Sequence, residues 1–324
     1  MRILLINPNT SRAMTAKIAA AARGVAGPGV EIEAVCPTNG AAAIESHTDE
    51  IAAAAAVVEL VVADRDGPTP ADAYVVACFG DPGLDAAREL VAAPVVGIAE
   101  AAMHLAAISG RHFGVVTTLS RTLGRAHDLV ARYGMERSCV SLAATGIPVL
   151  DLEDTGSEAV ATIERLSADA AAGGADVIVL GCAGMADLCA ELTARVGVPV
   201  VDGVAAAVGM ASGMVRMGLG TSKRDEYALP PRVPVAGAGS ASGASGAPGD
   251  PGAGTASARA ASGAATASRS GTLGFGARSA VRGESLAPRG AESAPNGASR
   301  AAGSATNGEA PAAPPQTSDF AVFA

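Results

Sequence analysis

The sequence predicts an α/β fold of two pseudosymmetric parallel-sheet lobes with a cleft between them, followed by a disordered C-terminal tail. Short β-rich runs alternate with Ala-rich helical runs, a pattern typical of a parallel sheet covered by helices. About halfway through the predicted folded region this series begins again, which predicts the second lobe. Beyond Pro230 the chain is almost all Ala, Gly, Ser and Pro, and so little apolar surface cannot offset the entropy of ordering.

The first lobe is predicted from alternating segments rich in β-branched residues and in alanine. We expect strands at residues 2–6, 31–35, 74–77 and 95–97, and helices at 11–22, 50–62, 83–90 and 100–108. Thr10 or Ser11 precedes the first helix and is expected to cap it, because a short polar side chain can accept from a free backbone N–H there.

The second lobe is predicted to repeat this order. We expect strands at 113–116, 139–143, 177–180 and 198–201, and helices ending near 133 and covering 157–172 and 204–214. The catalytic region is expected to span 1–231, with one lobe formed by 1–98 and 208–222 and the other by 99–207. Residues 232–324 are expected to form the low-complexity tail.

An internal repeat relates the two halves. The first half contains "VVACFG" (75–80) and "APVVGIAEAAMHLA" (93–106), and the second contains "VIVLGCAG" (177–184) and "VPVVDGVAAAVGMA" (198–211). Cys78 lies 16 residues before Pro94, and Cys182 lies 17 residues before Pro199. The two cysteines therefore occupy equivalent strand ends, related by an expected pseudo-two-fold axis.

Composition excludes several classes of function. The net charge is −9, and the first 230 residues contain only two lysines, Lys17 and Lys223, so a nucleic-acid partner is not expected. The most apolar long run, 51–63, contains Glu59 and is too short to span a bilayer. Five cysteines without a C-x-x-C pair argue against a disulfide framework or a zinc knuckle. We expect a cytoplasmic protein that acts on a small molecule, with no membrane partner.

The candidate site lies where strands end. Asn9, Cys78, Thr118 and Cys182 each follow a predicted strand, and ligands of open parallel sheets bind outside the carboxyl ends of the strands. A lone cysteine in such a position is more often a small buried hydrophobe. Two cysteines at repeat-equivalent ends, each beside a glycine, favour a catalytic role instead.

Two thiols facing one small substrate suit proton transfer on both faces of a carbon atom. One thiolate removes a proton and the other thiol returns one to the opposite face, which inverts the centre without a cofactor. The carbanion or enolate intermediate needs preorganised donors. The backbones of Phe79-Gly80 and Ala183-Gly184 are the candidates, and no P-loop, dinucleotide fingerprint or metal-binding arrangement is present.

Several segments, taken in order, resemble the hydantoin racemase branch of the aspartate/glutamate racemase superfamily, which also includes allantoin racemases. They are "INPNTS" (6–11), "ACFGDPGLDAARE" (77–89), "GVVTTLSRT" (114–122), "VLGCAGM" (179–185) and "TSKRDEYALPP" (221–231). The resemblance implies a two-lobed α/β fold, cofactor-independent two-base catalysis and a homo-oligomer. It places the two catalytic cysteines at Cys78 and Cys182. The polar residues that line the family's site fall on Asn9, Thr10, Ser11, Thr117 and Thr118.

The residues after each cysteine depart from the amino-acid racemases of this superfamily, which typically have Thr or Asn there. The apolar followers favour a neutral ring, so we expect inversion at C5 of 5-monosubstituted hydantoins. Allantoin racemisation by the same mechanism is the alternative, and a small-molecule binding protein without turnover is another. Two cysteines weigh against an arylmalonate decarboxylase.

Weaker interpretations stay open for the polar positions. Thr10 and Ser11 are as compatible with helix capping as with ligand contact, Asn9 could belong to a simple turn, and Thr117 and Thr118 could cap the next helix. His47, in "IESHTDE" (44–50), is interpreted as an exposed loop histidine, although a place near the entrance of the site is the alternative.

Overall fold

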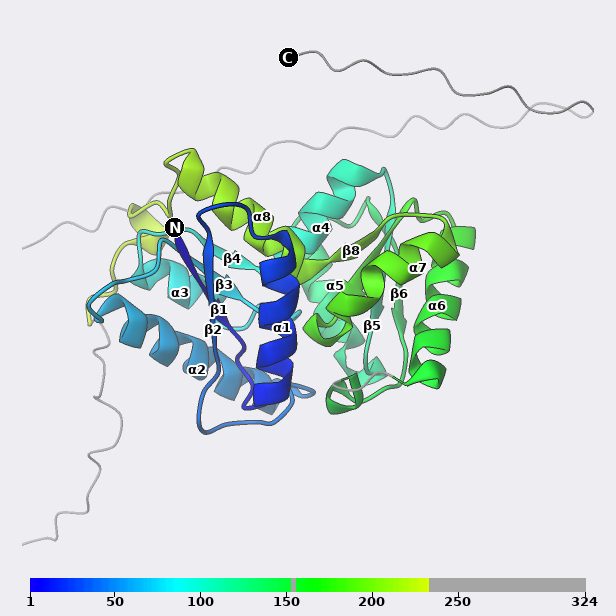
Figure 1. Cartoon of the computed structure of the whole chain (residues 1–324), viewed down its shortest axis with the longest axis horizontal. Coiled ribbons are helices and arrows are strands. Elements are labelled where there is room, and N and C mark those ends of the chain that lie inside the picture. The colour runs from blue at the N-terminus through cyan, green and yellow to red at the C-terminus, as the bar shows by residue number, and fades with distance from the viewer. Residues whose placement is uncertain (153–155, 233–324) are drawn as a thin grey trace, which may run out of the picture. The chain divides into compact units, whose positions relative to one another are not determined.

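Two four-stranded sheets, both entirely parallel, form the framework of the computed structural model, which describes residues 1–152 and 156–232 (Figure 1). The predicted α/β class with two parallel sheets is confirmed. The predicted disorder of 232–324 falls almost wholly on residues outside the described part. The proposed lobe boundaries stay a prediction.

The first sheet has the strand order β2-β1-β3-β4. Its strands are β1 (Arg2–Ile6), β2 (Glu31–Val35), β3 (Ala73–Val76) and β4 (Val95–Gly97). The helices that alternate with them are α1 (Arg12–Val25), α2 (His47–Arg65), α3 (Leu84–Leu90) and α4 (Ile98–Ser109). Every residue of β3 is buried, as expected for a strand covered by helices on both faces.

The second sheet has the corresponding order, β6-β5-β7-β8. Its strands are β5 (Phe113–Thr117), β6 (Cys139–Ala144), β7 (Val177–Gly181) and β8 (Val200–Asp202). The helices that follow its strands in the chain are α5 (Leu123–Arg132), α6 (Ser157–Ala172), α7 (Cys189–Val196) and α8 (Gly203–Arg216). Short 3₁₀ segments lie at Ser120–Thr122, Val149–Leu152, Ala183–Leu188 and Asp225–Tyr227. The repeat seen in the sequence thus corresponds to a repeat in topology.

Side-chain caps fix where several helices begin. Ser11 caps α1 by accepting from the backbone N–H of Met14 at 3.0 Å. Ser46 caps α2 in the same way, so that helix starts three residues earlier than the sequence pattern predicts. Asp202 caps α8 through two backbone N–H groups. Each cap satisfies donors that a helix leaves free at its first turn.

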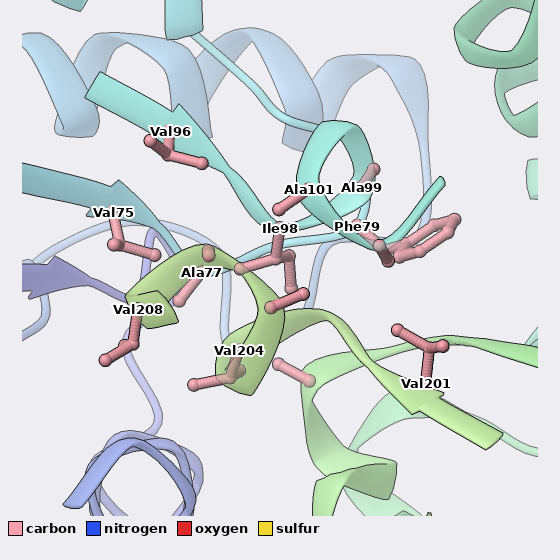
Figure 2. Packing of buried hydrophobic residues seen from close by; sticks show 14 of the residues in the cluster. Val75, Ala77, Phe79, Val96, Ile98, Ala99, Ala101, Val201, Val204 and Val208 are labelled. Carbon is pink, nitrogen blue, oxygen red and sulfur yellow. The ribbon is translucent and has the colours of Figure 1, made fainter. Parts of the chain in front are cut away.

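One apolar core joins the two sheets. Helices α4 and α8 pack against each other, and α8 contacts β3 while α4 contacts β7. Figure 2 shows Phe79 after β3, Ile98 at the start of α4, and Val201 and Val204 around the start of α8 in this one cluster. A Cβ at Gly203 would lie 2.7 Å from the carbonyl oxygen of Ile98, so only glycine permits this approach. None of the helices in the described ranges is long and apolar enough to cross a membrane.

Candidate active site

A pocket of about 200 Å³ lies at the carboxyl ends of strands from both sheets. It is lined by both predicted catalytic cysteines and by most of the predicted substrate-binding residues: Asn9, Cys78, Phe79, Gly80, Thr117, Thr118, Cys182, Ala183 and Gly184. Parallel strands bring their carboxyl ends to one edge of a sheet, which explains why residues so far apart in sequence meet here.

The Cys78 thiol lies in a tight turn that follows β3. The N–H of Asp81 donates to the carbonyl of Cys78 at 2.9 Å, and Arg125 of α5 donates to the carbonyl of Gly80 at 2.7 Å. The backbone N–H of Gly80 faces the Cys78 sulfur, where it favours a thiolate. The thiol is half-buried and borders the pocket.

The Cys182 thiol follows β7 in a similar turn. The N–H of Met185 donates to the carbonyl of Cys182 at 3.1 Å, and the N–H of Gly184 faces the thiol. Thr117, at the end of β5, donates its hydroxyl to the carbonyl of Gly181 at 3.0 Å and so ties the two strand ends together. A Cβ at Gly181 would lie 2.8 Å from that of Thr117, so glycine is needed there.

Both thiols are held in their neutral form when the pocket is empty. Burial raises the pKa of Cys78 to about 12, and the charges of Cys182, Asp81 and Glu50 act in the same direction. Burial raises the pKa of Cys182 to about 11; the nearby Lys17 ammonium opposes this increase. The charge of Cys182 adds to the raised pKa of Cys78, so the two thiols share one electrostatic environment.

Asn9 lies in a buried network of amides at the end of β1. The side-chain nitrogen of Asn7 donates to Oδ1 of Asn9 at 2.7 Å and to the hydroxyl of Thr15 at 2.9 Å. Oδ1 of Asn9 also accepts from the N–H of Ser11 at 2.9 Å. The oxygen of Asn9 is therefore occupied, and its amide nitrogen is the atom that can meet a ligand.

Thr10 and Ser11 do not line the pocket. Thr10 directs both its N–H and its hydroxyl to the carbonyl of Ala41, at 3.0 and 3.4 Å. Ser11 caps α1, as described above. Of the two residues expected to cap the first helix, Ser11 does so, whereas Thr10 binds the segment before α2.

A charged wall, defined as Glu45, His47, Glu50, Arg121 and Arg125, completes the lining. Arg125 forms an ion pair with Glu50, which joins α5 of one lobe to α2 of the other. Glu45 accepts from the N–H of Val149 at 2.8 Å. The His47 side chain is 86% exposed at the start of α2, so the histidine lies at the rim.

Sequence reasoning missed this wall apart from His47. Its members lie in the segment before α2 and around the start of α5, and only the contact between lobes brings them together. The segment "TLSRT" (118–122), which runs from a strand end into a helix, is the one local signal that could have indicated Arg121. Across residues 1–152 and 156–232, no three His, Cys, Asp or Glu side chains are grouped so as to hold a metal ion.

Comparison with known proteins agrees with this architecture. The family model for Asp/Glu/hydantoin racemase matches residues 3–211. A hydantoin racemase of Rhizobium meliloti is 44% identical over 232 residues, which cover 71% of this chain and 95% of the relative. The structure of an allantoin racemase from Klebsiella pneumoniae is 49% identical with a TM-score of 0.70, over 74% of this chain and 97% of that one.

A second solved structure supports the same assignment. An allantoin racemase from Pseudomonas fluorescens is 42% identical with a TM-score of 0.69, and the match covers 73% of this chain and all of that one. The matches cover almost the whole length of each relative. The part of this chain that they leave uncovered is about as long as the predicted tail. The chain therefore belongs to the Asp/Glu/hydantoin racemase family and is an enzyme of the racemase class.

Proposed function

We propose that the protein inverts the C5 centre of hydantoin-type rings by proton transfer between Cys78 and Cys182, without a cofactor. The observation that carries this proposal is that two thiols from equivalent strand ends border one small pocket, each facing the backbone N–H of a nearby glycine. The relatives named hydantoin racemase and allantoin racemase support the same substrate class. A binding protein without turnover is less well supported, because the racemase family covers both lobes.

The proposed reaction conserves atoms and charge at each step. The thiolate of one cysteine takes the C5 proton, the C–H bonding pair becomes an enolate on the adjacent carbonyl, and an S–H bond forms. The thiol of the other cysteine then gives its proton to the opposite face of C5 and becomes the thiolate. Raised thiol pKa values make each thiolate a stronger base, at the cost of a smaller ionised fraction at neutral pH.

Stabilisation of the enolate requires donors close to the ring. The N–H groups of Gly80 and Gly184 face the two sulfurs, so they serve the thiolates first. Asn9 and Thr118 also line the pocket, and we assign the amide nitrogen of Asn9 and the hydroxyl of Thr118 to the ring oxygens. This assignment refines the expectation that the backbones after the cysteines hold the enolate.

The charged wall favours allantoin over hydantoins with an apolar C5 substituent. Phe79 and Ala183 provide apolar surface beside the two cysteines, which suits the face of a neutral ring. Arg121, Arg125 and Glu50 provide charged groups at the pocket, and Nε of Arg125 is buried without a hydrogen-bond partner among the described residues, although Arg125 pairs with Glu50. A polar ureido group at C5, as in allantoin, matches this wall better than an alkyl or aryl group does.

The test uses enantiopure 5-benzylhydantoin and enantiopure allantoin in D₂O, followed by circular dichroism and by deuterium at C5. We expect loss of optical activity together with deuterium incorporation, with a higher kcat/KM for allantoin. Cys78→Ser and Cys182→Ser should each lower racemisation by at least about a hundredfold. The matched control is Cys36→Ser, which replaces another half-buried strand-end cysteine that does not line the pocket. Full activity in either pocket variant would refute the two-base mechanism. Assembly as a homo-oligomer and a cytoplasmic location stay predictions.

A further inference from the structure

The Cys78 turn contains a residue in an unusual backbone conformation. Asp81 has a φ of 45°, in the left-handed region that non-glycine residues rarely adopt. Such a conformation costs energy and persists only where surrounding contacts fix it. Here the peptide unit between Gly80 and Asp81 is held at both ends. Its N–H donates to the carbonyl of Cys78, and its oxygen accepts from Arg125.

The Asp81 side chain is fixed as firmly as its backbone. The carboxylate is only 2% exposed and accepts from the N–H groups of Ala99 and Glu100, at 3.1 and 2.9 Å. These donors belong to the first turn of α4, where a helix favours negative charge. The hydroxyl of Tyr133, at the end of α5, donates to the same carboxylate at 2.6 Å. Asp81 precedes α3 in the chain, but its carboxylate binds the first turn of α4 instead.

Glycine at position 97 makes this contact possible. A Cβ there would lie 2.3 Å from the carboxyl carbon of Asp81. The backbone of Gly97 has a φ of −85°, which any residue can adopt, so its lack of a side chain is what matters. The end of β4 is therefore shaped to receive this carboxylate.

We propose that Asp81 is a positioning residue for the Cys78 thiol and that Tyr133, from the second lobe, locks it in place. The inference rests on the proposed role of Cys78 in proton transfer. Arg125 and Tyr133 both come from α5 or its end, and both act on the four-residue turn that holds Cys78. Because α5 follows a strand of the sheet that carries Cys182, these contacts set the position of one thiol relative to the other.

The Cys182 turn has no equivalent lock. The residue three positions after Cys182 is Met185, whose buried side chain cannot accept a hydrogen bond of this kind. Loss of the Asp81–Tyr133 contact should therefore affect Cys78 and leave Cys182 unchanged. A merely structural role in holding the two lobes together would affect both thiols alike.

The chain offers a matched control. The hydroxyl of Tyr74 donates to the carboxylate of Asp64 at 2.7 Å, and Tyr74 is 1% exposed. Neither residue lines the pocket. Tyr74→Phe therefore removes a partly buried Tyr–Asp hydrogen bond, as Tyr133→Phe does, at a site that does not hold Cys78.

The first experiment measures alkylation of the full-length protein by iodoacetamide, with the rate at each cysteine followed by peptide mass spectrometry. In Tyr133→Phe and Asp81→Asn we expect alkylation of Cys78 to accelerate several-fold, because the released turn exposes the sulfur. The rate at Cys182 should not change, and Tyr74→Phe should alter neither. Equal changes at both thiols, or no change at Cys78, would overturn the proposal.

The second experiment measures C5 hydrogen exchange in D₂O with only one pocket thiol present. In the Cys182→Ser background, Tyr133→Phe should slow exchange by about tenfold or more, because small misplacements of a reacting group cost this much. In the Cys78→Ser background the same substitution should leave exchange unchanged, and equal slowing in both would overturn the proposal. If the unsubstituted protein catalyses no exchange, the proposed function fails, while the alkylation rates still decide the positioning role.

Discussion

Substitution of Gly97 by alanine should strongly destabilise the protein, because the added methyl group would occupy the space of the Asp81 carboxylate. The built Cβ lies 2.3 Å from the carboxyl carbon and 2.4 Å from each oxygen, whereas carbon atoms pack at about 3.5 Å or more. The carboxylate would have to retreat by more than about 1 Å. That movement breaks its hydrogen bonds to Ala99, Glu100 and Tyr133, which measure 2.6–3.1 Å.

The expected loss follows from leaving a buried carboxylate without its partners. A buried hydrogen-bonding group left without its partners costs about 1–3 kcal/mol, and more when the group is charged. Urea unfolding of the full chain, followed by circular dichroism, measures the change in the free energy of unfolding. Gly209→Ala is the control, because Gly209 lies exposed within α8 with no atom within 4 Å of an added Cβ. It should stabilise the protein by about 0.5–1 kcal/mol. A loss below about 1 kcal/mol in Gly97→Ala would refute the reasoning.

Two further predictions concern the active site. The kcat/KM for racemisation should rise by about tenfold per pH unit between pH 7 and 9. The reason is that the thiol pKa values, about 11 for Cys182 and about 12 for Cys78, lie above this range, so the thiolate fraction grows in proportion to the hydroxide concentration. A plateau below pH 8, after subtraction of the uncatalysed rate, would contradict this. Ser11→Ala should cost about 1 kcal/mol in urea unfolding through loss of the α1 cap, and KM should stay within about twofold of the parent value. A large rise in KM would instead show that Ser11 contacts the substrate.

The alternation of strands and helices could be predicted because each element carries its own local signal. The repeat around Cys78 and Cys182 could be recognised for the same reason, since both halves use similar residues at similar spacing. The contacts between the lobes have no such local signal in the sequence. Arg125 acts on Gly80, 45 positions away, and nothing near either residue indicates that they meet.

Asp81 shows the same limit on a smaller scale. Asp81 lies just before the short helix α3, a position typical of an acid that stabilises the first turn of that helix, but its carboxylate reaches the first turn of α4, 18 positions later. The preference of helix N-termini for carboxylates was the correct physical rule, applied to the wrong helix. Only the parallel order of β3 and β4 brings the turn after one strand to the helix that follows the other.

The two sheets have the same strand order, and this has a consequence for the kinetic constants of the proposed enzyme with the two enantiomers of its substrate. Two enantiomers have equal free energy, so thermodynamics requires kcat/KM to be the same in both directions. The two strand ends nevertheless differ, since Lys17 lies near one thiol and Asp81 and Glu50 near the other. Any difference between the two directions must therefore appear in kcat and KM together: the enantiomer with the lower KM also has the lower kcat, by the same factor.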